Sequence, residues 1–219
     1  MMDQRVRIRF SKRGELRFLG HRDLIRTLER LFRRAGLQLA MSKGFHPRPR
    51  MSFTTALGVG TAGLEEVMDL ELAKQYESAE LIRQLRRHTV PGIDIISLEV
   101  LGDSDAKLKA KSAWYDVPVP SELQAAITQK IDQFMAAESY WVTRPAQRQK
   151  TAPSQKVDIR PYVLRLLLDP PQLRMELAVG NEATVRPQDI LEILGLAKLF
   201  HQGDFITRAK IQLQKKEIL

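Results

Sequence analysis

Two hydrophobic periods alternate along the first hundred residues, and their order limits the folds that this chain can adopt. Val6, Ile8 and Phe10 alternate with arginines, which is the period-2 pattern of a half-buried strand. Leucines then recur at helical spacing through residues 21–35, and Gly36 is placed to end an amphipathic helix. The sequence thus predicts a strand followed directly by a helix.

The predicted order of the next elements extends this start to a familiar arrangement. Strands are expected at residues 37–41, 66–72 and 93–101, and a second helix from Ser78. The order strand, helix, strand, strand, helix, strand is typical of the split βαβ, or ferredoxin-like, domain. Residues 1–103 are predicted to form one such domain, with a proline-rich loop at residues 42–53 as its main insertion.

The second half of the chain repeats this order less regularly. Residues 102–111 are polar and charged, and are expected to link two domains. In residues 112–219 a helix is expected at 121–137 and another begins at Pro187. The predicted fold class is α+β, with two ferredoxin-like (split βαβ) domains in tandem, residues 1–103 and 112–219. Each would have an antiparallel sheet with helices on one face.

Basic residues are concentrated in the first quarter of the chain. Residues 1–60 hold 14 Lys and Arg against 4 Asp and Glu, a net charge of +10. The other 159 residues hold 21 and 22, a net charge of −1. Such asymmetry indicates a site for a polyanion, and RNA is the polyanion that we expect. The alternative is a solvated basic surface that has no partner.

Residues 44–50, Gly-Phe-His-Pro-Arg-Pro-Arg, form the segment best suited to such a site. The two prolines restrict the backbone, so the side chains between them are partly arranged in advance. Arg48 and Arg50 can each hold a phosphate with paired hydrogen bonds. Phe45 and His46 can stack on bases, as in proteins that read single-stranded RNA. The alternative is a rigid crossover loop with incidental charge.

Basic residues of the predicted first strand and first helix add to this loop. They can share a surface only where helix and sheet meet at an edge, because helices cover one face of the sheet. The predicted nucleic-acid contacts are Arg7, Arg9, Lys12, Arg22, Arg26, Arg30, Lys43, Phe45, His46, Arg48 and Arg50. A solvated helix face is the alternative for the helix arginines.

The four histidines are His21, His46, His88 and His201, and they lack the spacing and carboxylate neighbours of a zinc site. His21 and His46, with Lys43 nearby, are candidates for a metal-independent acid–base pair that would cleave RNA at the 2′-hydroxyl. A capping or stacking role is the alternative for both histidines.

What the sequence lacks excludes several classes of site. Without cysteine, the chain can form no disulfide, thiolate zinc site or cysteine-ligated iron–sulfur cluster. Phosphate-loop, dinucleotide-binding, nucleophile-elbow and zincin motifs are missing too, and we expect no cofactor or metal in this chain. The first residues lack the apolar core of a signal peptide, and no stretch approaches the length of a membrane helix. A cytoplasmic location without a membrane partner is therefore expected.

The block from Arg7 to Glu71 resembles a known protein family. The likeness lies in Arg-Phe-Ser-Lys at 9–12, Leu-Arg-Phe-Leu-Gly-His-Arg-Asp-Leu at 16–24, Arg-Arg-Ala-Gly-Leu at 33–37, and residues 42–50 and 52–53. It continues more weakly through residues 157–163. These segments are similar to the radical-SAM-associated family of uncharacterised function, whose members are encoded beside, or fused behind, a radical SAM protein of the cobalamin-binding-like type. This chain would be the stand-alone form, and the resemblance implies a radical SAM partner but no reaction.

A looser likeness is to the repeat-processing RNA endonucleases of CRISPR systems, which pair two ferredoxin-like domains and carry an early Gly-Phe-x-Pro-type stretch, as at 44–47 here. The leading hypothesis is an RNA-binding accessory protein that holds tRNA or ribosomal RNA for a radical SAM enzyme. The second is a metal-independent endoribonuclease that uses His46, His21 or Lys43. The third is a protein–protein adaptor whose basic surface meets an acidic face of the radical SAM partner.

Overall fold

The computed structural model describes residues 3–102, 105, 108–144, 154–180, 185–201 and 206–215, and the side chains of Phe200, His201 and Lys215 lie outside this description. The chain divides into two compact units. The first comprises residues 1–109 together with 208–219, and the second comprises residues 110–207. The second unit is therefore inserted, in sequence, between two parts of the first.

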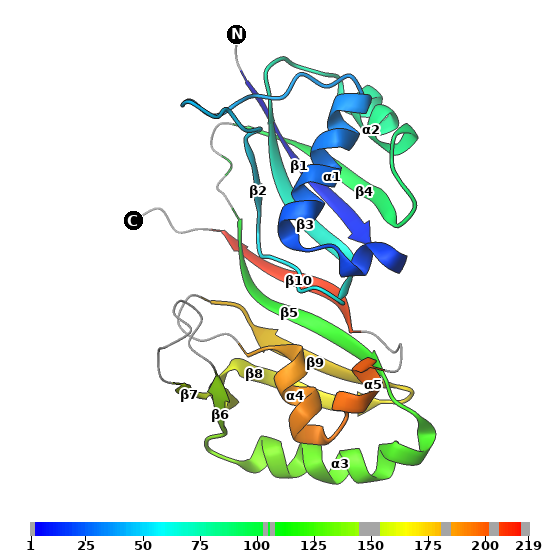
Figure 1. Ribbon diagram of the computed structural model, residues 1–219, viewed down its shortest axis with the longest axis vertical. Coiled ribbons are helices and arrows are strands. Elements are labelled where there is room, and N and C mark those ends of the chain that lie inside the picture. The colour runs from blue at the N-terminus through cyan, green and yellow to red at the C-terminus, as the bar shows by residue number, and fades with distance from the viewer. Residues whose placement is uncertain are drawn as a thin grey trace. The chain divides into compact units, whose positions relative to one another are not determined.

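The first unit contains an antiparallel sheet covered by helices. Its elements are β1 (Gln4–Lys12), the 3-10 helix η1 (Gly14–Phe18), α1 (His21–Arg34), β2 (Met51–Phe53), β3 (Ala62–Leu72), α2 (Ser78–Arg87) and β4 (Ile93–Leu101). Strand β1 lies between β4 and β3, and β2 pairs with the other edge of β3. Figure 1 shows α1 and α2 on the same face of this sheet.

The core of the first unit lies between these helices and the sheet. Val6, Ile8 and Phe10 of β1 are fully buried against Leu28 of α1 and Leu85 of α2. The alternating residues of β1 point to the opposite, open face, since successive side chains of a strand leave on opposite sides. The predicted α+β class and its antiparallel pairing are confirmed.

The predicted strand at residues 37–41 is wrong. This segment makes isolated bridges, Leu39 with Leu72 and Met41 with Pro49, rather than a ladder. The returning segment takes the hydrogen bonds that a longer strand would need: Arg50 donates its N–H to the carbonyl of Ala40, and Glu71 donates its N–H to the carbonyl of Arg50. Strand β2 therefore occupies the edge of β3 that the prediction gave to residues 37–41.

The second unit has its own sheet and core. Its elements are β5 (Leu108–Pro118), α3 (Ser121–Ala136), β6 (Trp141–Arg144), β7 (Gln155–Asp158), η2 (Arg160–Tyr162), β8 (Val163–Asp169), β9 (Gln172–Ala178), α4 (Pro187–Leu194) and α5 (Ala197–His201). Strand β9 pairs antiparallel with both β5 and β8, and β6 pairs with β7. Ile127, Met175 and Ile190 lie in one buried cluster, so α3, β9 and α4 share a core.

The last strand, β10 (Thr207–Lys215), was expected to belong to the predicted domain 112–219, but most of it belongs to the first unit. Residues 208–219 cluster with the first unit. Arg208 explains this placement, because its guanidinium forms a buried, two-fold ion pair with Glu66 of β3 and donates to the carbonyl of Ala56. Strand β5 also begins at Leu108, inside the stretch predicted as a linker.

No helix within the described ranges combines the length and apolar character needed to cross a membrane.

Candidate nucleic-acid interface

Helix α1 and the loop that precedes β2 enclose a groove of about 620 Å³. Three guanidiniums line it: Arg22 and Arg26 from the helix and Arg48 from the loop. Glu29, two prolines of the loop and two apolar side chains complete the lining. We call this feature the arginine groove, and it brings together residues from the two segments that the sequence had marked as basic.

The helical repeat places one side of α1 along the arginine groove. Arg22, Arg26 and Glu29 are spaced i, i+4 and i+7, so they lie along one side of the helix. Leu24, Leu28 and Leu31 point into the core instead. The two-faced pattern that predicted this helix therefore also presents its arginines to the loop.

Carboxylates engage the guanidiniums of the arginine groove only in part. Arg26 lies 3.3 Å from Asp23, but both side chains are more than half exposed, so the pair is weak. Glu29 is bound by Arg33 at 2.8 Å. Among the described residues, neither Arg22 nor Arg48 forms an ion pair. Two strong hydrogen-bond donors of the groove are thus available to an anion.

Residues 42–48 form a closed loop, which we call the finger. At its base Ser42 donates its N–H to the carbonyl of Arg48 at 2.8 Å, and Arg48 donates its N–H to the hydroxyl of Ser42 at 3.0 Å. Gly44 has a φ of 133°, a region that favours glycine. At the tip, Lys43, Phe45 and His46 are exposed, and Phe45 is completely so. The finger therefore presents an aromatic ring to solvent from a base held by hydrogen bonds.

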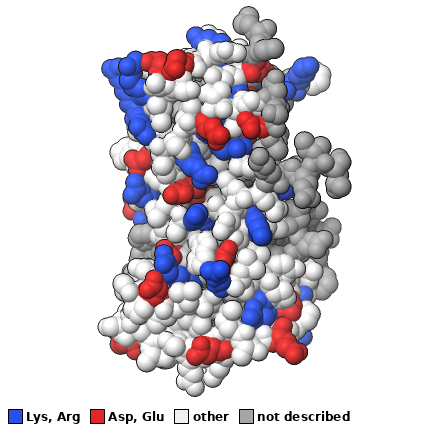
Figure 2. All heavy atoms as spheres, turned by 180° about the vertical axis from the view of Figure 1, so that it is seen from behind, with Lys and Arg blue, Asp and Glu red and all other residues white. Residues whose placement is uncertain are grey.

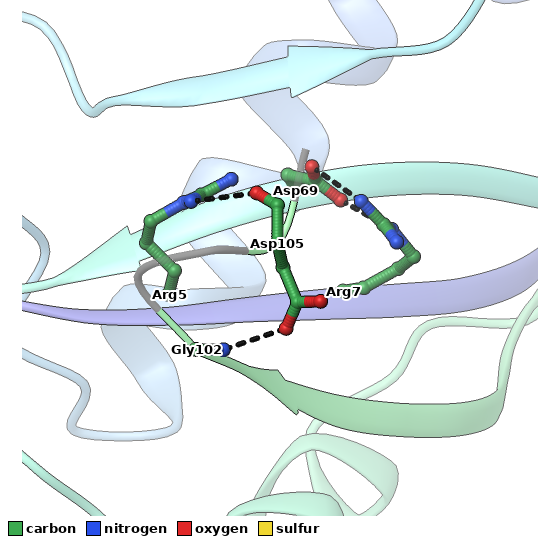
Figure 3. Close-up of polar contacts among 5 residues, drawn as sticks. All are labelled: Arg5, Arg7, Asp69, Gly102 and Asp105. Carbon is green, nitrogen blue, oxygen red and sulfur yellow. Dashed lines mark hydrogen bonds and ion pairs between the residues drawn. The ribbon is translucent and has the colours of Figure 1, made fainter. Parts of the chain in front are cut away.

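The arginines of β1 lie apart from the arginine groove, on the open face of the sheet. Arg7 is 8% exposed and its guanidinium donates to both oxygens of Asp69, at 2.8 and 3.0 Å (Figure 3). Strand pairing sets this contact, because Arg7 lies directly opposite Asp69 in the β1–β3 ladder. Arg7 is therefore paired within the sheet and does not join the arginine groove.

Carboxylates of β3 also meet the other cations of this face. Arg9 lies 3.9 Å from Glu65, and Arg50 lies 2.7 Å from Glu71. Arg5 donates to the carbonyl of Asp105 in the same region (Figure 3). Figure 2 shows basic and acidic side chains interspersed over the side seen from behind, without a uniform basic patch. The structure therefore does not group Arg9 and Arg50 with the arginine groove.

Lys12 was also predicted as a contact, and this prediction is wrong because its side chain is fully buried. Its ammonium donates to the carbonyl of Leu19 at 2.9 Å, and Glu66 and Arg208 lie close enough to act on it electrostatically. Burial lowers the pKa of Lys12, and the carboxylate of Glu66 opposes this shift. Sequence periodicity gave no signal for this cluster, since Arg208 is far from Lys12 and Glu66 in the chain.

The remaining candidates occupy separate places. Arg30 is exposed on α1 and donates to the hydroxyl of Thr27, outside the lining of the arginine groove. The rings of His21 and Phe53 pack in a T-shaped arrangement with centroids 5.0 Å apart, and Nδ1 of His21 is buried without a hydrogen-bond partner. His46 is exposed on the finger. The acid–base pair of His21 and His46 stays a prediction.

No group of three His, Asp or Glu side chains gathers as metal ligands within the part of the chain that the structure describes.

Comparisons with known proteins place the chain in a family without assigning an activity. No curated protein matches the sequence. Among solved structures, an unknown protein from Galdieria sulphuraria aligns at 10% identity and a TM-score of 0.31, covering 98% of this chain and 99% of that one. The small subunit of acetolactate synthase from Thermotoga maritima aligns at 10% identity and a TM-score of 0.27, covering all of both chains. Likenesses of this size carry no argument about the site.

A family model matches residues 5–187, which include the arginine groove, the finger and most of the second unit. The chain therefore belongs to DUF2344, a family described as an uncharacterized protein conserved in bacteria.

Proposed function

We propose that this protein binds RNA through the arginine groove and the finger, and that it holds tRNA or ribosomal RNA for a radical SAM enzyme. The observation that carries the proposal is the convergence of Arg22, Arg26 and Arg48 on one groove. A solvated basic helix would not need a second segment of the chain to bring another guanidinium opposite its own.

The chemistry of the groove suits a phosphate backbone. Guanidinium groups bind phosphate through two parallel hydrogen bonds, and two of the three have no carboxylate partner among the described residues. The exposed ring of Phe45 offers a stacking surface for a base at the tip of the finger. A small acidic ligand would use the cations but would leave this ring uncovered.

The role of the partner rests on the resemblance of residues 9–53 to the radical-SAM-associated family. A radical SAM cluster is held by cysteine thiolates, and this chain has no cysteine. The division of labour that we propose therefore gives the cluster and the reaction to the partner, and the RNA to this chain. We also propose that both units are ferredoxin-like, since the orders β4-β1-β3-β2 and β8-β9-β5 are compatible with that topology.

Binding to total tRNA and to ribosomal RNA, measured across a range of salt, tests this function. The variant carrying Arg22→Gln, Arg26→Gln and Arg48→Gln is expected to bind at least tenfold more weakly at low salt. The slope of log K against log salt should become shallower by about 1.4 if contacts to two phosphates are lost. A control of equal charge change is Arg83→Gln, Arg87→Gln and Arg165→Gln, which alters exposed arginines that do not line the groove. Equal loss in both variants would contradict a localised site.

The two other hypotheses are outcomes of parallel experiments. Cleavage of RNA in the presence of chelator that His46→Ala abolishes would favour the endoribonuclease. Co-purification with the radical SAM protein after nuclease treatment, in the absence of nucleic-acid absorbance, would favour the adaptor.

A further inference from the structure

We infer that the arginine groove and the finger take a short unpaired stretch of RNA, about two nucleotides long, with one base stacked on Phe45. This inference rests on the proposed function and specifies the form of RNA that the same site accepts.

The first step is the exposure of Phe45. Its ring is completely exposed, although a phenylalanine ring is among the largest apolar groups that a protein can bury. The hydrogen bonds between Ser42 and Arg48 close the base of the finger, and Pro47 restricts its backbone. A ring presented from a closed loop loses little further freedom when a partner covers it. A flat, apolar base face is a partner of the right size and chemistry.

The second step excludes a base within a duplex. In an A-form helix each base is covered by its neighbours, and the deep groove is too narrow for a side chain to read. Phe45 could therefore stack only on a base that is splayed out, at a bulge, in a loop or at an end. The aromatic finger thus selects for unpaired nucleotides.

The third step sets the length of the site. Arg22 and Arg26 are separated by four residues on α1, which corresponds to about 6 Å along the helix axis. Arg48 lines the same groove from the loop. Glu29 comes three residues after Arg26 in the lining, and its negative charge opposes a further phosphate. The positive part of the groove therefore spans about two successive phosphates before the sign of the charge changes.

A fluorescent single-stranded RNA of eight nucleotides, carrying one 2-aminopurine, is the probe for this arrangement, and the same strand annealed to its complement is the comparison. The single strand is expected to bind at least tenfold more tightly than the duplex. The slope of log K against log salt for the single strand should be about −1.4, because each of the two phosphates that the site neutralises contributes about −0.7. Stacking on Phe45 should also quench the 2-aminopurine.

Matched variants separate the base contact from the phosphate contacts. Phe45→Ala should weaken the single strand by roughly 5- to 150-fold and remove the quenching, without changing the salt slope. Phe45→Trp should preserve both properties. Phe18→Ala is the control, because Phe18 is also an exposed phenylalanine but lies in η1, where Arg17 covers its ring. Glu29→Gln should tighten binding and make the slope steeper by about 0.7, since it removes the anion and releases Arg33 from its pair.

The outcomes distinguish this inference from the proposed function. Equal affinity for single strand and duplex, or full binding and quenching by Phe45→Ala, would overturn the inference while the loss caused by the three arginine substitutions still supports RNA binding. If neither form of RNA binds with a dependence on salt, the proposed function falls and the inference falls with it.

Discussion

The buried ion pair between Glu66 and Arg208 gives the most exacting test of the first unit. Both side chains are almost completely buried, and Lys12 is buried beside them. Glu66→Gln would leave two buried cations without their shared carboxylate. Breaking a buried pair by removing one partner costs about 3–5 kcal/mol of unfolding free energy, and the second cation places this variant at the upper end. Arg208→Met should cost less, since the ammonium of Lys12 still acts electrostatically on Glu66.

Urea unfolding followed by two probes measures these changes in unfolding free energy and assigns them to one of the two units of the chain. Both tryptophans, Trp114 and Trp141, belong to the second unit, so their fluorescence reports on it, whereas far-UV circular dichroism reports on the whole chain. Replacing all three groups, with Lys12→Met, Glu66→Leu and Arg208→Met, should restore stability to near that of the native protein, because well-packed apolar residues often replace buried charges without loss. A cost below about 1 kcal/mol for Glu66→Gln, or a greater cost for Arg208→Met, would refute the reasoning.

Three further predictions use other parts of the first unit. Gly44→Ala should weaken RNA binding although it replaces none of the side chains proposed to contact RNA, because a φ of 133° strains alanine. A fluorescence titration measures the affinity, and an affinity equal to that of the native protein would show that the conformation of the finger is unimportant. Because burial lowers the pKa of Lys12, the unfolded chain holds that proton more tightly than the folded one, so the unfolding free energy should rise with pH from the lowered pKa up to 10.5. Lys12→Met should remove that rise in urea titrations at several pH values. Hydrogen bonds from Arg13 and Ser11 lower the pKa of Asp94, so its contribution to stability is present above 3.8 and is lost as pH falls through the lowered value. The double substitution Arg13→Gln and Ser11→Ala should return the pKa of Asp94 toward 3.8. An NMR titration measures this pKa, and an unchanged value would contradict the proposed origin of the shift.

Local hydrophobic periodicity correctly predicted those elements of the first unit whose own residues show a regular helical or strand period. The helix expected at residues 21–35 is α1, and the alternation of β1 gave its core face correctly. The strand at 37–41 could not be judged in this way. Whether a short apolar segment joins a sheet depends on which segment reaches the edge of β3, and β2 reaches it from the other end of a loop.

The net charge of residues 1–60 overstated the basic surface for a similar reason. Three carboxylates that pair with its cations come shortly after that window, at Glu65, Asp69 and Glu71. Strand pairing, which a count along the sequence does not contain, brings Asp69 opposite Arg7. The arginines of α1 that line the groove lie on the side of the helix away from its buried leucines. Their convergence with Arg48 depends on the path of the loop, which a count along the sequence does not contain.

The nested order of the two units has a consequence for biosynthesis. A ribosome releases residues 1–109 before the stretch 110–207 and delivers β10 after both. During translation, Arg208 therefore emerges long after Glu66 and Lys12, so their buried cluster forms late. The second unit is one continuous stretch of chain, so it can fold before the first unit is complete. A nascent chain that stops before β10 would carry an arginine groove on an incomplete sheet, and such a product would be a ready substrate for cellular proteases.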